Sequence, residues 1–340
     1  MHHKVIIGRN NFREKIFLSI YSKKKIRIKT LKNSGIKKFE INLLCLVDKI
    51  APESFFFLNE SGTILDFCPG NLTGGKIFHK TDTFRSLPYY LEFICYITLI
   101  SKTWIELKLT GLRSINTDLS LESFLYSTIP MYRKFGGGDI RIKIWTEKLS
   151  KKKNTNAIFF FPGRSNIKYF KIEFPGELKG LRILISSPLL TRINQEKIKL
   201  LIGNEFPFKN IDYKIYSFDI SNKNIFFQTI TIISQTLKGH LISVDFTSVK
   251  YRKTKFWLDI LTDLTGYLKI QLESKGLLDI RLQTFFLLKV LVEKYKGFFF
   301  KVANLTISNL HLLRDIKKFL GIFFRIVPIL KYNFLIIKIC

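Results

Sequence analysis

The strongest constraint on the fold is a pattern that recurs along the chain: a helix-like stretch, a short turn, and a strand in which polar and apolar residues alternate. In the first copy, Phe12, Ile16, Phe17 and Ile20 share one helical face, and residues 25–29 then alternate with period two. Further copies cover 86–101 with 104–109, 119–135 with 140–144, and 309–320 with 322–327, and a second helix type at 39–50 precedes a strand at 54–58. Because each helix must bury its apolar face against a sheet, the repeats predict a body of the α+β or α/β class.

The pattern changes between residues 182 and 251. This segment predicts a helix at 193–202, followed by three strands near 209–218, 224–234 and 240–248. A long amphipathic helix at 255–272 comes next, and we expect it to return to the body. The sequence therefore predicts a discontinuous large domain, 1–181 with 252–340, and a small inserted α/β domain at 182–251.

Composition indicates a folded chain without a disulfide framework or a structural zinc site. The 340 residues are 46% hydrophobic, which is enough to fill a core and excludes disorder as the main state. Two apolar runs, 89–100 and 319–340, are too short or too often interrupted by charge for a membrane span, which needs about 20 apolar residues. The first residues leave no room for a secretory signal. The four cysteines lie far apart, without a spacing typical of a disulfide framework or a zinc site.

Charge points to a polyanionic partner. The chain carries 56 basic and 26 acidic residues, a formal net charge of +30. Residues 1–40 contain 12 basic and 2 acidic residues, whereas 41–140 contain 9 and 10, and the basic excess returns after residue 140. Uniform compositional drift in an AT-rich genome would not leave such a neutral block. The distribution therefore indicates basic surfaces, with RNA favoured over DNA and an anionic membrane as the partner.

Two basic segments are candidates for this contact. Segment 8–13 joins a short apolar strand to a helix, and it is either an anion site at the helix N-terminus or an ordinary turn with an Asn cap. Segment 151–153 is a basic loop, either solvated or in contact with RNA phosphates. The residues predicted to contact RNA or an anion are Arg9, Asn10, Arg13, Lys151, Lys152 and Lys153.

Other motifs favour structural interpretations. The triple glycine at 136–138 is either a phosphate cradle or a helix cap that turns into a strand, and the cap needs fewer assumptions. His79, His240 and His311 have no Ser, Cys or carboxylate at a spacing that indicates a triad, so they are interpreted as surface or packing residues. The helix at 312–320 has an apolar face, with its charged residues largely off that face. Those charges form either a solvated surface or a docking or RNA-contact surface.

The order and spacing of several short segments are specific in combination. They are Asn11-Phe12-Arg13, residues 39–50, Gly62-Thr63, Pro69-Gly70, Gly74-Gly75, Tyr90-Leu91-Glu92, Leu109-Thr110-Gly111, Lys134-Phe135-Gly136 and residues 313–318. Over nearly its whole length the chain resembles the RNA 3′-terminal phosphate cyclase-like proteins of ribosome biogenesis, the non-cyclising branch of the RNA cyclase family. The resemblance implies an α+β, cyclase-like fold of repeated βαβαββ modules with a small inserted α/β domain.

Departures from the true cyclases bear on activity. Ser308 stands where the resemblance places the histidine that cyclases adenylate, and His311, within the following helix, is not accepted as a substitute. A hydroxyl without a strong base cannot replace that imidazole as a nucleophile. Segment 8–11 replaces a Gly-rich loop, and its bulkier side chains would obstruct a nucleotide phosphate. Residues 151–156 also replace a Pro- and Gly-rich segment. We therefore expect no ATP-dependent cyclisation, no cofactor and no metal.

The resemblance implies an RNA-binding pseudoenzyme of the small-subunit processome, located in the nucleolus of a nucleus or relict nucleus. Its implied role is to support pre-rRNA cleavage and small-subunit rRNA maturation. The implied partners are a ribosome-assembly GTPase and pre-rRNA, with no membrane. The protein is expected to be a monomer within a large ribonucleoprotein.

The implied functional cluster consists of Arg314, Asp315 and Lys317, and two hypotheses share it. In the scaffold hypothesis, the cluster binds the GTPase through charge-assisted hydrogen bonds. In the alternative, the protein is itself a pre-rRNA endonuclease, with Asp315 as the base and Arg314 or Lys317 stabilising the transition state. The sequence favours the scaffold, because one carboxylate without a convincing histidine or metal site is little equipment for phosphodiester cleavage.

Overall fold

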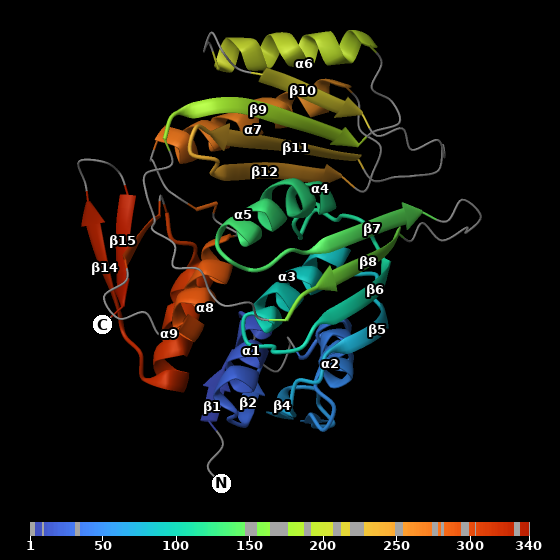
Figure 1. The fold of residues 1–340 in the computed structure, drawn as a ribbon, viewed down its shortest axis with the longest axis vertical. Helices are drawn as coiled ribbons and strands as arrows, with labels where there is room; N and C mark the ends of the chain where they lie inside the picture. Colours follow the sequence, from blue (N-terminus) through green and yellow to red (C-terminus); the bar gives the residue numbers. More distant parts are fainter. Residues whose placement is uncertain are drawn as a thin grey trace.

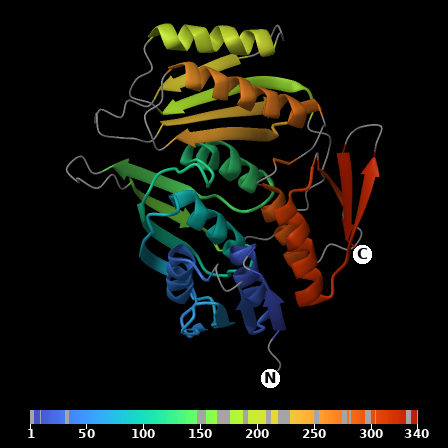
Figure 2. The same ribbon diagram turned by 180° about the vertical axis from the view of Figure 1, so that it is seen from behind.

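In the residues that the structure describes, the strands form four sheets with helices packed against them (Figures 1 and 2). The structure is a computed structural model. It describes residues 4–8, 10–30, 35–146, 155–163, 176–186, 192–206, 212–217, 228–248, 254–273, 278–279, 282–293, 299–302, 304–329 and 334–339. Helices and sheets are mixed along the chain, so the α+β class is confirmed.

The first two sheets share one topology, which confirms the predicted βαβαββ module for this part of the chain. The first module consists of β1 (Lys4–Ile7), α1 (Phe12–Ser22), β2 (Ile26–Lys29), α2 (Lys38–Ile50), β3 (Phe55–Leu58) and β4 (Ile64–Cys68). Its sheet order is β1-β2-β4-β3, with β1 parallel to β2 and β4 antiparallel to both its neighbours. Helix α1 connects β1 to β2 as a crossover, which lets these two consecutive strands lie parallel and side by side.

The second module repeats this order. It consists of β5 (Gly75–Lys80), α3 (Leu87–Thr98), β6 (Ile105–Gly111), α4 (Leu121–Ser123), the π-helical turn η2 (Phe124–Thr128), α5 (Ile129–Lys134), β7 (Arg141–Thr146) and β8 (Thr155–Phe161). The sheet order is β5-β6-β8-β7. In β6, Ile105, Leu107 and Leu109 are buried and the residues between them are half-buried, as period-two alternation requires. The apolar run of α3 is a buried helix, as predicted.

The third sheet has its own hydrophobic core. It has the order β10-β9-β11-β12, with β9 (Leu178–Ser186), β10 (Asp212–Ser217), β11 (Gln228–Thr236) and β12 (Leu241–Ser248), and two helices, α6 (Arg192–Glu205) and α7 (Thr254–Glu273). We expected α7 to return to the large body. It packs instead on β11 and β12 and against α6, because Leu261, Leu264 and Leu268 complete this second core.

The division into 1–181 with 252–340 and 182–251 stays a prediction. The extent of the second core leads us to propose that the inserted unit also includes β9 from Leu178 and the whole of α7. The unit rests on α4 and η2 of the second module (Figure 1). There, buried Ser120 donates its backbone N–H to Asp245, and its hydroxyl lies 3.0 Å from that of Thr231.

The C-terminal segment returns to the large body. It consists of α8 (Leu282–Glu293), β13 (Phe299–Val302), α9 (Ile307–Leu320), β14 (Phe324–Ile329) and β15 (Phe334–Ile339), with the strand order β13-β15-β14. Helix α9 packs beside α1, so the two ends of the sequence meet (Figure 1). The main core joins α1, α2, α3, α8 and α9 to the first two sheets. None of the helices described is long and apolar enough to cross a membrane.

Candidate functional site

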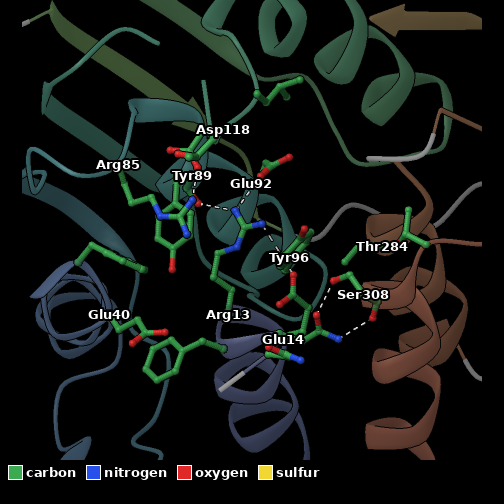
Figure 3. A pocket seen from close by; sticks show the side chains of 17 residues that line it. Arg13, Glu14, Glu40, Arg85, Tyr89, Glu92, Tyr96, Asp118, Thr284 and Ser308 are labelled. Atoms are coloured by element: carbon green, nitrogen blue, oxygen red, sulfur yellow. Dashed lines mark hydrogen bonds and ion pairs between the residues drawn. The ribbon is translucent and has the colours of Figure 1, made fainter. Parts of the chain in front are cut away.

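A cavity of about 460 Å³ lies where the N-terminal ends of α1 and α9 meet α3 (Figure 3). Its charged lining consists of two arginines, Arg13 and Arg85, and four carboxylates. The carboxylates are Glu14, Glu40, Glu92 and Asp118. The remaining lining residues are Asn10, Asn11, Phe12, Phe39, Tyr89, Tyr96, Thr117, Leu119, Thr284, Thr306 and Ser308. Although the protein is strongly basic, the carboxylates outnumber the arginines around this cavity.

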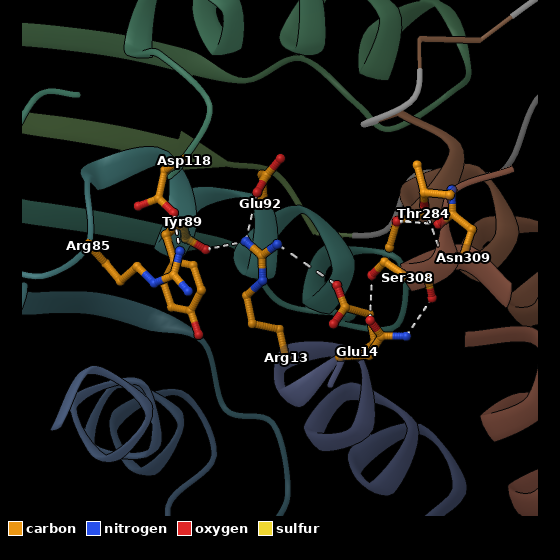
Figure 4. A network of polar contacts seen from close by, with 11 residues as sticks. Arg13, Glu14, Arg85, Tyr89, Glu92, Asp118, Thr284, Ser308 and Asn309 are labelled. Carbon is orange, nitrogen blue, oxygen red and sulfur yellow. Dashed lines mark hydrogen bonds and ion pairs between the residues drawn. The ribbon is translucent and has the colours of Figure 1, made fainter. Parts of the chain in front are cut away.

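Arg13, predicted to contact RNA or an anion, is bound within the protein. Its Nη1 donates to the Tyr89 carbonyl at 2.8 Å and to Glu92 Oε2 at 2.7 Å, and its guanidinium lies 4.5 Å from the centre of the Tyr89 ring (Figure 4). Burial acts to lower the pKa of Arg13, but the charge of Glu92 raises it well above its ordinary value. A polyphosphate would have to displace Glu92 to bind this side chain.

Arg85 is held in the same way on the other side of Tyr89. It forms a short ion pair with Asp118, whose other carboxylate oxygen accepts from the Ser86 backbone N–H at 2.8 Å. The Arg85 guanidinium lies 4.7 Å from the Tyr89 ring centre and 4.4 Å from that of Phe39. Tyr89 therefore has a guanidinium near its ring from each arginine, and both arginines are fixed by carboxylates and aromatic rings (Figure 4).

Ser308 lies in the first turn of α9 and faces Asn11, which precedes α1. Asn11 Nδ2 donates to the Ser308 carbonyl at 2.7 Å, and the Ser308 hydroxyl donates to Asn11 Oδ1 (Figures 3 and 4). Asn11 adopts a left-handed backbone conformation with φ of 59°, and its side chain bonds Ser308 instead of capping α1. An amide oxygen accepts this hydrogen bond but does not take the proton, so the pair does not activate Ser308 as a nucleophile.

Asp315 lies on the buried side of α9, although the sequence pattern placed the helix charges largely off its apolar face. Its Oδ2 is 3.6 Å from the ammonium of Lys15 in α1. Lys15 Nζ also donates to the carbonyls of Gly8 and Asn10, at 3.0 and 2.6 Å. Burial lowers the pKa of Lys15 and raises the pKa of Asp315, and the attraction between them opposes both shifts. The pair joins the segment before α1 to α9.

Arg314 and Lys317 lie on the opposite, exposed side of α9. They continue a line that begins with Ile307 and Leu310, because positions 307, 310, 314 and 317 share one helical face. The ammonium of Lys317 lies 4.5 Å from the ring centre of Phe323, just after the helix. The structure therefore brings Arg314 and Lys317 onto one surface and separates Asp315 from them. None of the three lines the cavity.

The other predicted positions are placed as follows. Asn10 is exposed at the rim of the cavity, whereas Arg9, Lys151, Lys152 and Lys153 lie outside the described residues. Gly136 and Gly138 have positive φ angles after α5 and lead towards β7, so the cap interpretation is confirmed. His79 and His240 are buried packing residues, as interpreted, and His311 is half-buried on α9.

Sequence reasoning missed most of the cavity. The sequence places Glu92 within an apolar run and in the segment Tyr90-Leu91-Glu92, but it assigns no role in a site to Glu92, Arg85, Tyr89 or Asp118. A usable signal was present: a single carboxylate within an otherwise apolar helix must find a partner when it is buried. That the partner is Arg13 follows only from the packing of α1 on α3.

Comparison with known proteins identifies the family. The family model described as RNA 3′-terminal phosphate cyclase matches residues 6–326. A probable RNA 3′-terminal phosphate cyclase-like protein of Arabidopsis thaliana is 24% identical over 96% of this chain and 92% of its own length. The human RNA 3′-terminal phosphate cyclase-like protein is 25% identical over 73% and 69%. An rRNA processing protein of Saccharomyces cerevisiae is 27% identical over 38% and 36%. The chain therefore belongs to the RNA 3′-terminal phosphate cyclase family.

Proposed function

We propose that this protein takes part in rRNA processing as a non-cyclising scaffold, in which α9 binds an assembly GTPase and basic surfaces contact pre-rRNA. The coarse role is supported by relatives that are named rRNA processing proteins. The finer role places the protein in the small-subunit processome, in the nucleus or nucleolus. There it supports pre-rRNA cleavage on the path to small-subunit rRNA.

One observation carries the proposal: the exposed face of α9 sets two apolar side chains in line with two cations. Ile307 is 74% exposed at one end of this face, Leu310 follows, and Arg314 and Lys317 extend it with two cations. A helix exposes apolar residues at this spacing when another protein covers them. The arginine adds a planar group suited to a carboxylate of that partner.

The cavity supports the non-cyclising part of the proposal. Its two arginines are bound to Glu92 and Asp118, and Ser308 is bound to an amide in the position of the cyclase histidine. Nucleotidyl transfer needs cations available to the phosphates and a nucleophile with a base. In this cavity both arginines and the Ser308 hydroxyl already bind other side chains of the protein.

The endonuclease alternative requires Asp315 to act as a base beside Arg314 or Lys317. Asp315 is buried against Lys15, on the side of α9 away from both of those residues. It would have to leave Lys15 and cross the helix to reach an RNA on the exposed face. The geometry therefore favours a positioning role for Asp315.

The test combines partner binding with RNA cleavage on the same purified samples. We expect Arg314→Ala to weaken binding of the assembly GTPase at least tenfold and Lys317→Ala to weaken it less. Arginines that a partner buries within an interface are common hot spots. Lys269→Ala, an exposed lysine on α7, is the matched control. Site-specific cleavage of a pre-rRNA fragment that Asp315→Asn abolishes without loss of partner binding would overturn the scaffold proposal in favour of the endonuclease.

A further inference from the structure

The second module leaves one face of its sheet uncovered. Helices α2 and α3 pack on the inner side of the β5-β6-β8-β7 sheet, and its other side is turned outward (Figure 1). We refer to this outward side, together with Trp104 at its edge, as the outer sheet face. Phe78 is 63% exposed there and Trp104 is 43% exposed. Exposed rings of this size on a sheet indicate a binding surface.

The strand register places aromatic and basic side chains next to one another on this face. One row across the strands is Phe78, Lys108, Ile158 and Lys143. The next row is Lys76, Glu106, Phe160 and Arg141. A third row begins with Lys80 and ends with Trp145. The rows repeat because neighbouring strands are about 4.8 Å apart and alternate residues point to the same side.

Direct contacts show that rings and cations interleave. The Lys108 ammonium lies between two rings, 5.6 Å from the centre of Phe78 and 5.7 Å from that of Trp145. The Arg141 guanidinium lies 5.7 Å from the centre of Phe160. Trp104 and Phe160 stack with an interplanar angle of 23°. These contacts place rings and cations side by side across the outer sheet face.

Charge selects the ligand. Five cations, Lys76, Lys80, Lys108, Arg141 and Lys143, stand on this face against one carboxylate, Glu106. A face of this kind attracts a polyanion, and its rings offer stacking surfaces for planar groups. Single-stranded nucleic acid supplies both, whereas the bases of a duplex are stacked on each other and do not present their faces. We propose that the outer sheet face binds single-stranded RNA, with bases stacked on Phe78, Trp145 and Phe160 and phosphates held by the lysines and Arg141.

The inference deepens the proposed function, on which it rests only for the choice of RNA over DNA. It places RNA on a surface that is separate from the cavity and from the exposed face of α9. A protein partner would also accept aromatic anchors, but the five-to-one excess of cations favours a phosphate backbone over an ordinary protein surface.

The test is fluorescence anisotropy of a labelled single-stranded RNA decamer and an RNA hairpin duplex with the full chain. We expect Phe78→Leu and Trp145→Leu each to weaken decamer binding roughly 5- to 50-fold, as for loss of a stacked base, and to change duplex binding less than twofold. Phe57→Leu is the matched control, an exposed phenylalanine on β3 of the other module. The urea unfolding midpoint of each variant verifies that it is folded.

Salt dependence separates the phosphate contacts from the stacking. Arg141→Gln combined with Lys143→Gln should lower the slope of log K against log salt by about 1.4 for the decamer, since each phosphate contact contributes about 0.7 for single strands. Equal effects of Phe78→Leu and Phe57→Leu would overturn the inference. Absence of GTPase binding by the wild type, with intact decamer binding, would overturn the proposed function alone. GTPase binding by the wild type without decamer binding would overturn only the inference.

Discussion

Lys15 is 2% exposed, and its ammonium group lies between the segment before α1 and helix α9. Three oxygens make this position tolerable: the carbonyls of Gly8 and Asn10 and the carboxylate of Asp315. The cost of removing both charges from water is offset only while the partners remain together. Asp315 therefore acts through Lys15 on the segment before α1, which forms one wall of the cavity.

The first prediction concerns this pair. Asp315→Asn should lower the free energy of unfolding by about 3 kcal/mol, because it leaves the buried ammonium without its counter-charge. Urea denaturation measures the change, and Lys269→Ala, at an exposed lysine on α7, should change it by less than about 0.5 kcal/mol. A double-mutant cycle with Lys15→Met should give a coupling above about 1 kcal/mol. Strictly additive effects would show that the two side chains do not interact.

The second prediction concerns His79, which is buried on β5. Its Nε2 lies 2.9 Å from Asn42 Oδ1 in α2, and burial, aided by the charge of Lys49, lowers its pKa from 6.5 to about 4. Because the folded-state pKa is below the unfolded value, the stabilisation is present above pH 6.5 and is lost as the pH falls towards 4. Between pH 7 and 4.5, wild type should lose roughly 2 kcal/mol more than His79→Gln in urea unfolding. Parallel pH profiles would contradict the assignment.

At the scale of the element, the end of α5 shows why three glycines stand together. Gly136 and Gly138 have φ angles of 78° and 87°, which only glycine adopts without strain. Gly137 is needed for space: a Cβ there would lie 2.2 Å from the ring of Tyr132. Tyr132 is itself buried, with its hydroxyl 2.7 Å from that of Thr98. The turn therefore packs on a ring that cannot move away.

The third prediction follows from this contact. Gly137→Ala should destabilise the protein by about 2 kcal/mol, because the methyl group forces Tyr132 out of its site. Gly203→Ala in α6 is the matched substitution, since a Cβ there meets no atom within 4 Å. Within a helix it should be neutral or stabilise by up to about 1 kcal/mol. Thermal or urea unfolding of both variants checks the contrast, and similar changes would exclude the steric explanation.

Helix α9 carries different sets of side chains on its two sides. Its inner side contributes Leu312, Ile316 and Phe319 to the main core and presents Asp315 to Lys15. Its outer side presents Ile307, Leu310, Arg314 and Lys317 to solvent. Because the helix is anchored through its whole inner side, the outer residues are held rigidly, which lowers the entropy cost of binding a partner.

At the scale of the whole molecule, basic charge and the cavity are separated. The chain has a net charge of +30, but the lining of the cavity contains more carboxylates than arginines. The outer sheet face, in contrast, carries five cations and one carboxylate. A polyanion is therefore attracted to the outside of the second module and not to the cavity. This separation fits the proposal that the protein binds RNA on its outer surface and not in the cavity.

Periodicity predicted many of the helices and strands, because these depend on residues close together in sequence. The βαβαββ order of the modules was implied by the family resemblance. Thus α1, α3 and β6 were predicted within a few residues of their observed bounds. The same local pattern failed for α7, whose apolar face did not indicate which sheet it would cover. The sequence also predicted the helix cap at 136–138, because glycine adopts the positive φ angles that end a helix.

Only the tertiary structure decided the cavity and the burial of Asp315. Arg13 meets Glu92 because α1 packs on α3, and Lys15 meets Asp315 because the first and last helices of the main core lie side by side. Likewise, alternation predicted β6 and β7, but the register across the four strands of the second module is what gathers Phe78, Lys108 and Trp145 on one face. Contacts between segments distant in sequence depend on how the elements pack, and periodicity indicates which face of an element is buried but not which other element covers it.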